Sequence, residues 1–301
     1  MTSWPFRLIL LASIWGLSFL FIKIADQTLA PVQVVFSRVG LGALVIVGFS
    51  LIKGQKLPRS KLTWLHLSVV ALLFNTIPFT LFAYGELQVS AIMAGLLNAV
   101  TPLVTLPLAL WLLKAEKLTK LKAFGLGIGF LGVIVVLGIW QIPNLNSLSG
   151  DLECLGAATS YGAGFIYIRR YLTHRSEGPI AFTAGQLICA TFETAIFLPL
   201  TKAPTSFPLS VIISIILLGA FGTGVAYILN YAIVSEAGAV AASTVTYIMP
   251  IFSTLAAIVI LNEPLRWYEP VGAIIILSGA GISQGLINPK FFTRTPTEIE
   301  I

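Results

Sequence analysis

One short pattern occurs twice in this chain. Ile14-Trp15-Gly16-Leu17-Ser18-Phe19 is followed by Lys23, and roughly 146 residues later Tyr161-Gly162 and Phe165 are followed by Arg169. Further pairs appear in the same order at nearly the same offset: Pro31 with Pro179, Pro102 with Pro250, Glu116 with Glu263, and Gly125 and Gly132 with Gly272 and Gly279. One such match has little weight, but several in order predict an internal duplication.

The repeated pattern lies within apolar runs that recur from one end of the chain to the other. Hydrophobic residues make up 57% of the 301 residues and charged residues only 10%, whereas a soluble domain carries about a quarter charged residues. Runs near twenty residues are long enough to cross the hydrocarbon of a bilayer. They predict an all-α membrane protein with ten transmembrane helices near 5–25, 32–52, 64–85, 89–112, 121–140, 150–171, 180–200, 209–232, 238–261 and 268–287.

The duplication and the positive charges predict how these helices are arranged. Each unit holds an odd number of helices, so the second unit must enter the membrane from the opposite side, as in inverted-repeat transporters. The expected units are 1–145 and 146–290, followed by a cytoplasmic tail at 291–301. Fourteen of the eighteen Lys and Arg residues fall on one side of such an arrangement. The positive-inside rule then places both termini in the cytoplasm.

Taken as a set, these motifs resemble those of the EamA-type branch of the drug/metabolite transporter superfamily. The resemblance rests on residues 14–19 with Lys23, Pro31 with Arg38, Ala91 to Pro102 leading to Glu116, Gly150-Asp151 through Arg169-Arg170, Ala239 to Pro250, 261–265 and 272–281. It implies ten helices in two inverted repeats and a central pocket walled by the first, third, fourth, sixth, eighth and ninth helices. By analogy, the chain also resembles bacterial exporters of aromatic amino acids and related metabolites.

Polar and aromatic side chains at helical spacing are the candidates for the pocket. They are Trp15, Phe19, Asn75, Phe79, Tyr84, Asn98, Thr101, Tyr161, Phe165, Tyr227, Asn230, Tyr231, Thr244 and Tyr247. Pro102 and Pro250 are expected to break the fourth and ninth helices, because proline lacks an N–H and its ring displaces the carbonyl four residues earlier. Hydrogen bonding between helices is an equal alternative for the amide and hydroxyl groups. Tyr84 and Tyr227 also fit an interfacial aromatic belt.

Four charged residues are candidates for gating or for binding charge. Lys23 and Arg169 lie at opposite membrane faces of the inverted arrangement, where they hold gates or substrate carboxylates, or snorkel to the interface. Arg38 follows Pro31 by seven residues, which places it about 10 Å into its helix. Glu193 is the acidic residue deep in a span, where structural pairing is favoured over proton coupling.

These features predict a secondary transporter that exports small metabolites, with amino acids favoured over drugs, sugars and nucleotide derivatives. A membrane-embedded enzyme is the alternative class, but no activated nucleophile, metal-ligand spacing or carboxylate pair supports catalysis. No cofactor, metal or nucleic acid is expected. The expected partners are a small-molecule substrate and the lipid of the cell inner membrane, and a monomer is compatible with the sequence.

Overall fold

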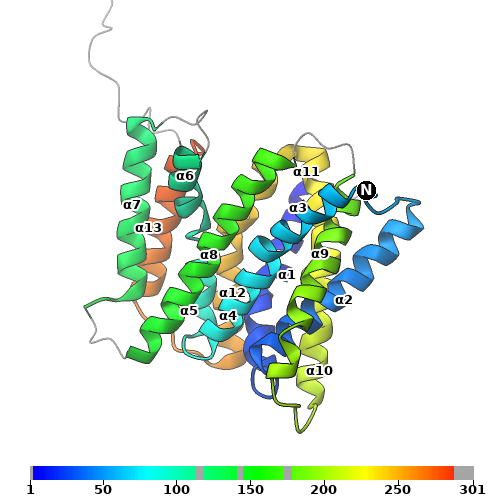
Figure 1. Cartoon of the computed structure of the whole chain (residues 1–301). Coiled ribbons are helices and arrows are strands. Elements are labelled where there is room, and N and C mark those ends of the chain that lie inside the picture. The colour runs from blue at the N-terminus through cyan, green and yellow to red at the C-terminus, as the bar shows by residue number, and fades with distance from the viewer. Residues whose placement is uncertain (1–2, 113–117, 141–144, 173–177, 288–301) are drawn as a thin grey trace, which may run out of the picture.

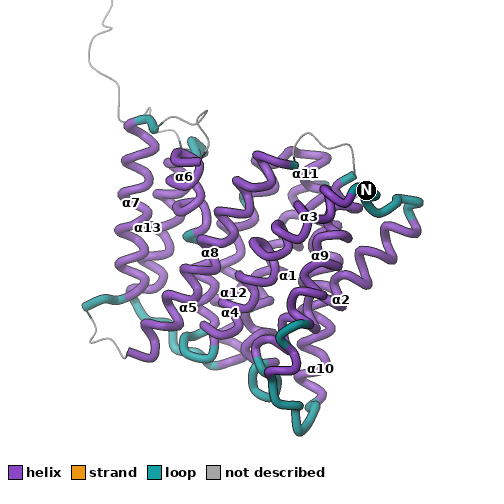
Figure 2. The backbone as a smooth tube through the Cα atoms, in the orientation of Figure 1, coloured by secondary structure: helices purple, strands orange, loops and turns teal. Residues whose placement is uncertain are grey.

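The computed structural model describes residues 3–112, 118–140, 145–172 and 178–287. Within these ranges all regular structure is helical, which confirms the predicted all-α class (Figures 1 and 2). The elements in chain order are α1 (Trp4–Ala25), α2 (Pro31–Ile52), α3 (Lys61–Ala71), η1 (Leu72–Thr76), α4 (Ile77–Glu86), α5 (Ala91–Asn98), α6 (Thr101–Leu112), α7 (Lys120–Leu137), α8 (Leu145–Tyr171), α9 (Pro179–Ala195), η2 (Leu198–Leu200), α10 (Leu209–Ile216), η3 (Leu217–Val225), α11 (Ala226–Ser243), α12 (Val245–Leu261) and α13 (Tyr268–Ser283). Glu116 and the tail at 291–301 lie outside the described residues.

Several of these elements join into longer apolar helices. Among the described residues, eight helices are long and apolar enough to cross a membrane: Trp4–Ala25, Pro31–Ile52, Lys61–Glu86, Ala91–Leu112, Lys120–Leu137, Pro179–Leu200, Leu209–Gly238 and Ala241–Leu261. α13 is apolar but shorter, and α8 is long but has a more polar sequence. These two helices occupy the positions where the sequence predicts the sixth and tenth spans.

Local sequence signals fix where many of these helices begin and end. The hydroxyl oxygens of Ser90 and Thr119 accept hydrogen bonds from the backbone N–H groups of Met93 at 3.0 Å and Lys122 at 3.2 Å, which caps α5 and α7. Proline stands in the first turn of α1, α2 and α9, where its missing N–H costs nothing. Gly138 ends α7 in the left-handed conformation, with φ of 56°.

Close helix pairs build the molecule. α7 lies along α13 at one side of the molecule, α1 packs against α12, and α2 packs against α9 (Figure 1). The α7–α13 contact depends on glycine. A Cβ added at Gly132 would lie 2.6 Å from the backbone nitrogen of Ile276, and one added at Gly279 would lie 2.3 Å from that of Gly129. The structure therefore shows close helix packing at these glycines.

Helix geometry is irregular at matching places in the two parts of the chain. η1 and η3 are π-helical segments inside the spans Lys61–Glu86 and Leu209–Gly238. α5 and α6 are separated by a turn at residues 99–100, and α11 and α12 meet at Thr244. π-helical insertions occur frequently at functional sites. All four irregularities belong to elements that surround the cavity described below.

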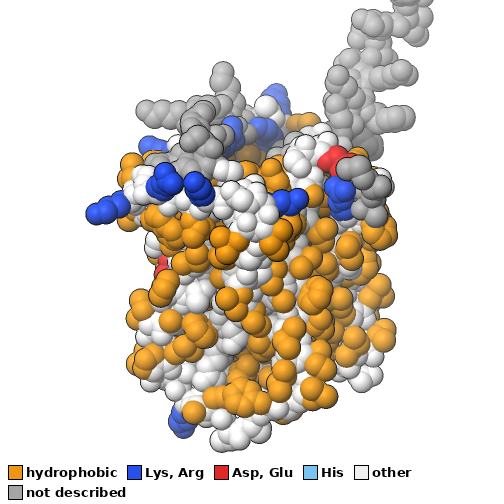
Figure 3. All heavy atoms as spheres, turned by 90° about the vertical axis from the view of Figure 1, so that its right-hand side faces the viewer, with side chains coloured by type: hydrophobic (Ala, Val, Ile, Leu, Met, Phe, Trp, Pro, Cys, Tyr) orange, Lys and Arg blue, Asp and Glu red, His pale blue; other side chains and the backbone are white. Residues whose placement is uncertain are grey.

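The surface separates apolar and positively charged side chains. On the face shown in Figure 3, hydrophobic side chains cover most of the molecule, and Lys and Arg gather at one end. Large side chains such as Leu44, Phe192 and Val259 are each more than 70% exposed. A soluble monomer rarely leaves so much apolar surface uncovered. This surface fits an environment of lipid.

Candidate functional site

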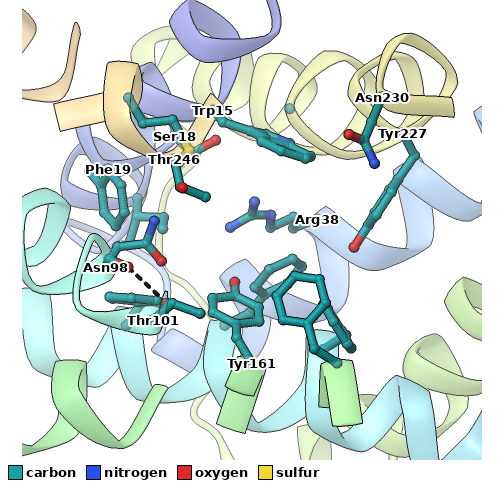
Figure 4. A pocket seen from close by; sticks show the side chains of 17 residues that line it. Trp15, Ser18, Phe19, Arg38, Asn98, Thr101, Tyr161, Tyr227, Asn230 and Thr246 are labelled. Atoms are coloured by element: carbon teal, nitrogen blue, oxygen red, sulfur yellow. Dashed lines mark hydrogen bonds between the residues drawn. The ribbon is translucent and has the colours of Figure 1, made fainter. Parts of the chain in front are cut away.

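A cavity of about 180 Å³ lies in the middle of the helices. Its walls come from α1, α2, η1, α4, α5, α6, α8, η3, α11 and α12. Ten residues predicted from the sequence line it (Figure 4): Trp15, Phe19, Arg38, Phe79, Asn98, Thr101, Tyr161, Phe165, Tyr227 and Asn230. Side chains from both parts of the duplicated sequence therefore meet around one space.

Eight of the seventeen residues that line the cavity are aromatic. Trp15 and Tyr227 meet edge to face with their centroids 6.3 Å apart, and Phe82 contacts both Phe19 at 5.4 Å and Tyr161 at 6.2 Å. Edge-to-face pairs stabilise one another beyond the burial of their area. The wall therefore presents aromatic faces to a ligand.

Arg38 brings a positive charge to the centre of this apolar space (Figure 4). The residue is 7% exposed, and its guanidinium carbon lies 3.6 Å from the centroid of the Phe79 ring. Its Nε donates to the hydroxyl of Thr223 at 3.1 Å. Arginine holds its charge at any physiological pH. The cavity therefore carries a fixed positive charge.

Irregular backbone places several of the lining residues. The ring of Pro102 would clash with the carbonyl of Asn98, which is where α5 ends. The hydroxyl of Thr101 then donates to that carbonyl at 2.8 Å, which leaves the Asn98 side-chain amide at the cavity wall (Figure 4). Phe74 and Gly222 reach the cavity from η1 and η3. At Pro250 the outcome differs, because α12 continues through it and the interruption lies at Thr244.

Comparison with known proteins identifies the family. The model of the EamA-like transporter family matches residues 2–138 and again residues 148–283. The chain belongs to this family. An uncharacterized transporter of Bacillus subtilis is 28% identical over 306 residues, covering 96% of this chain and 94% of that protein. An uncharacterized transporter of Archaeoglobus fulgidus is 27% identical over 278 residues, covering 90% of this chain and 95% of that protein.

Two further similarities concern an efflux protein and a solved structure. A protein of Salmonella typhimurium named "Probable amino-acid metabolite efflux pump" is 22% identical over 286 residues, covering 92% of this chain and 93% of that one. A crystal structure that is 19% identical in sequence has a TM-score of 0.64 and covers 94% of this chain and 96% of its own, which shows a shared fold. This EamA-like chain is a multi-pass membrane protein, and its family and relatives indicate transport rather than catalysis.

Five of the predicted pocket residues lie away from the cavity of this EamA-like protein. Asn75 is fully buried behind the wall, where its oxygen accepts from Gln186 at 2.6 Å and its nitrogen donates to the Tyr227 hydroxyl at 3.2 Å. Tyr84 is 40% exposed near the end of α4, as the interfacial alternative expects. Tyr231 packs against a separate hydrophobic cluster at α2 and α9. These three side chains are not among the lining residues.

Thr244 and Tyr247, the remaining two, are not among the residues that line the cavity. Thr244 donates to the carbonyl of Ala241 at 2.7 Å, and the Tyr247 hydroxyl donates to Gln284 at 2.7 Å. The cavity face of α12 carries Thr246 and Met249 instead. The helix begins anew at Thr244, so the face that its residues present cannot be extrapolated from a helix assumed to run on from residue 238.

Three of the predicted charged residues also lie outside the cavity lining. Lys23 donates to the backbone carbonyls of Glu86 and of Val89, the latter at 2.8 Å, and so caps the end of α4. Arg169 is exposed at the C-terminal end of α8. Glu193 accepts hydrogen bonds from Ser68 at 2.8 Å and Thr76 at 2.6 Å, which fits the structural pairing that the sequence favours over proton coupling.

Sequence reasoning missed seven lining residues: Ser18, Ile22, Phe74, Phe82, Gly222, Thr246 and Met249. Helical spacing could have found two of them. Phe82 follows Phe79 by three residues, and Ser18 follows Trp15 by three residues. Phe74 and Gly222 carry no such signal, because they lie in the π-helical segments, where the usual period fails. In the described residues no group of three His, Cys, Asp or Glu side chains is arranged to hold a metal ion.

Proposed function

We propose that this protein is a secondary transporter that exports small organic metabolites, with neutral and aromatic amino acids as the favoured substrates. The central cavity carries this proposal, since it joins aromatic rings with the side-chain amides of Asn98 and Asn230. Ligand sites are typically concave and mostly apolar, with a few polar groups that orient the ligand. The efflux pump of Salmonella typhimurium is a relative whose name points to the same kind of substrate.

Cavity size favours amino acids over larger substrates. Sites for drug-sized ligands occupy about 300–1,000 Å³, whereas this cavity measures about 180 Å³. That volume suits a single amino acid or a similar metabolite. Drugs and nucleotide derivatives are therefore the weaker candidates.

Alternating access is the mechanism we infer, with α8 and α13 completing a set of ten spans in two inverted five-helix repeats, near 1–145 and 146–290. Two separate matches to one family support the duplication. The paired helix interruptions and the π-helical segments at corresponding places support it as well. In such transporters the substrate lies near the midplane, where the two repeats meet, and the repeats rock about it. The cavity has walls from both repeats, so we expect the two repeats to move about a substrate bound there.

The charges of the loops suggest which side faces the cytoplasm. Lys53, Lys56 and Arg59 follow α2, and Lys202 stands at the other end of the molecule beyond α9. The positive-inside rule places the Lys-rich end in the cytoplasm of the inner membrane, with both termini on that side. Because the cavity forms within one chain, a monomer with its surrounding lipid suffices for transport.

Counterflow in proteoliposomes tests the function. Vesicles that contain the protein are loaded with an excess of one unlabelled compound, and uptake of traces of its labelled form is measured for amino acids, a sugar and a cationic dye, with and without a pH gradient. Neutral and aromatic amino acids should accumulate above protein-free vesicles. If the sugar or the dye accumulates and no amino acid does, the substrate assignment is wrong. The two pH conditions separate proton coupling from uniport.

Cysteine labelling tests the orientation. In the proposed topology a cysteine introduced at Gln55 lies in the cytoplasm, and one introduced at Lys202 lies outside. An impermeant maleimide added to intact cells should modify Lys202→Cys and leave Gln55→Cys unmodified until the cells are opened. The reverse pattern would refute the proposed orientation.

A further inference from the structure

The guanidinium of Arg38 has more donors than the protein uses. Its hydrogen bond to the Thr223 hydroxyl involves Nε alone, and its contact with the Phe79 ring involves the face of the guanidinium. In the described part of the chain, no acceptor pairs with its two terminal nitrogens. Figure 4 shows these nitrogens directed into the open space of the cavity. Four N–H donors are therefore available to a ligand.

The positive charge of Arg38 also lacks a close counter-ion. None of the described carboxylates lies within 4.0 Å of it. Of the seventeen residues that line the cavity, Arg38 is the only charged one, and none is acidic. A buried charge without a partner is unfavourable, and the cost is relieved when an opposite charge binds. The cavity therefore selects for an anion.

The geometry of arginine narrows the kind of anion. A planar guanidinium whose two terminal nitrogens are free binds a carboxylate through two parallel hydrogen bonds. Thr223 binds the Nε edge of the guanidinium and Phe79 contacts its face, so the orientation of the two terminal nitrogens is fixed before a ligand binds. Half of the other sixteen lining residues are aromatic, which favours an apolar or aromatic remainder of the ligand.

We propose that Arg38 is the carboxylate anchor of this cavity, and that the substrates are small apolar or aromatic carboxylates, including amino acids. This inference rests on the transport function proposed above and names the group that every substrate shares. Trp15, Phe19 and Tyr161 contact the apolar part of the ligand. For an amino acid, the amide oxygens of Asn98 and Asn230 are the acceptors for the ammonium group.

Binding to the purified protein in detergent tests this proposal without requiring transport. Three ligands of similar size are compared by titration calorimetry: L-phenylalanine, 3-phenylpropionate, which has the carboxylate alone, and phenethylamine, which has the amine alone. Both carboxylates should bind, and phenethylamine should bind at least tenfold more weakly. Equal binding of phenethylamine, or no binding by either carboxylate, overturns the proposal. Carboxylate binding without counterflow would instead overturn the proposed transport function, while the proposed role of Arg38 would still hold.

Variants connect the selectivity to the named residue. Arg38→Gln should weaken binding of both carboxylates about 10- to 100-fold, the range expected when a charge-assisted hydrogen-bonded pair is lost. Arg38→Lys keeps the charge but loses the planar guanidinium, so its affinity for the carboxylates should lie between those of the original protein and of Arg38→Gln. Arg59→Gln, in an exposed loop, is the matched control and should bind like the original protein. Unchanged affinity in a folded Arg38→Gln protein would refute the anchor. If that variant does not fold, Arg38→Lys and the ligand comparison decide the question.

Discussion

Replacing Gly132 with alanine tests the packing of α7 against α13. The added Cβ would lie 2.6 Å from the backbone nitrogen of Ile276 and 3.0 Å from the backbone oxygen of Gly272. Neither atom belongs to a flexible side chain, so the helices must move apart by roughly the shortfall from a normal contact of about 3.5 Å. Overpacking of this kind costs about 1–3 kcal/mol. Gly132→Ala should therefore destabilise the protein.

Gly127 provides a control on the same helix. No atom lies within 4 Å of a Cβ built there. Gly127→Ala therefore brings only the higher helix propensity of alanine, which stabilises by up to about 1 kcal/mol. The two variants make the same chemical change in opposite environments, so they should shift stability in opposite directions.

Tryptophan fluorescence during heating in detergent follows both variants. Trp140 and Trp267 stack with their centroids 5.9 Å apart, beside the C-terminus of α7 and the N-terminus of α13, so they report on this contact. For domains of 150–250 residues, 1 kcal/mol corresponds to about 2–4 °C. Gly132→Ala should melt several degrees lower, and Gly127→Ala at the same temperature or higher. Equal melting temperatures for the two variants would refute the close packing of α7 on α13.

Three further predictions concern a helix cap, the cavity wall and a buried carboxyl. Glu263 accepts hydrogen bonds from the first backbone N–H groups of α5 at 3.0 and 3.2 Å. Glu263→Ala should therefore lower the free energy of unfolding by about 1 kcal/mol, measured as a lower melting temperature. An unchanged melting temperature would exclude the cap. Phe79→Ala should raise the half-saturating concentration for counterflow because the cavity loses apolar contact with the substrate. Tyr247→Ala should leave that concentration unchanged. Equal effects of the two variants would mean that another face of α12 lines the cavity. Burial, opposed by Lys23, raises the pKa of Asp26 from 3.8 to about 8. The folded state therefore holds this proton more tightly than the unfolded state, and stability should fall as pH rises from about 4 to 8. Melting scans of Asp26→Asn should lose that part of the slope, and an identical slope would contradict the assignment.

Much of the fold follows from length and apolarity alone. Helices lie in each of the ten predicted ranges, and eight of the described helices are long and apolar enough to cross a membrane. In lipid, a run near twenty apolar residues leaves the backbone no other way to satisfy its polar groups. The detail inside those helices did not follow. η1 and η3 leave no mark in the apolar pattern. The interruption at Thr244 precedes Pro250 by six residues, so the proline indicates a weak point but not its position.

The candidate site was predictable where a helix is regular. Trp15 and Phe19 on α1, and Tyr161 and Phe165 on α8, lie one turn apart and reach the cavity as their spacing indicates. Polarity alone was a poorer guide. Asn75 satisfies its amide through Gln186 and Tyr227, which lie far from it in sequence. A polar side chain in a membrane helix must find partners, but its sequence does not say whether they are ligand, water or another helix.

Two-sided labelling of one cavity residue is the most direct test of alternating access through this cavity. Thr246→Cys, in a protein whose Cys154 and Cys189 are replaced by serine, places a single thiol at the wall. An impermeant maleimide is applied to right-side-out and to inside-out vesicles, with and without L-phenylalanine. Alternating access predicts modification from both sides and slower modification in both cases when L-phenylalanine is present. Modification from one side only, or at rates that L-phenylalanine does not change, would contradict transport through this cavity.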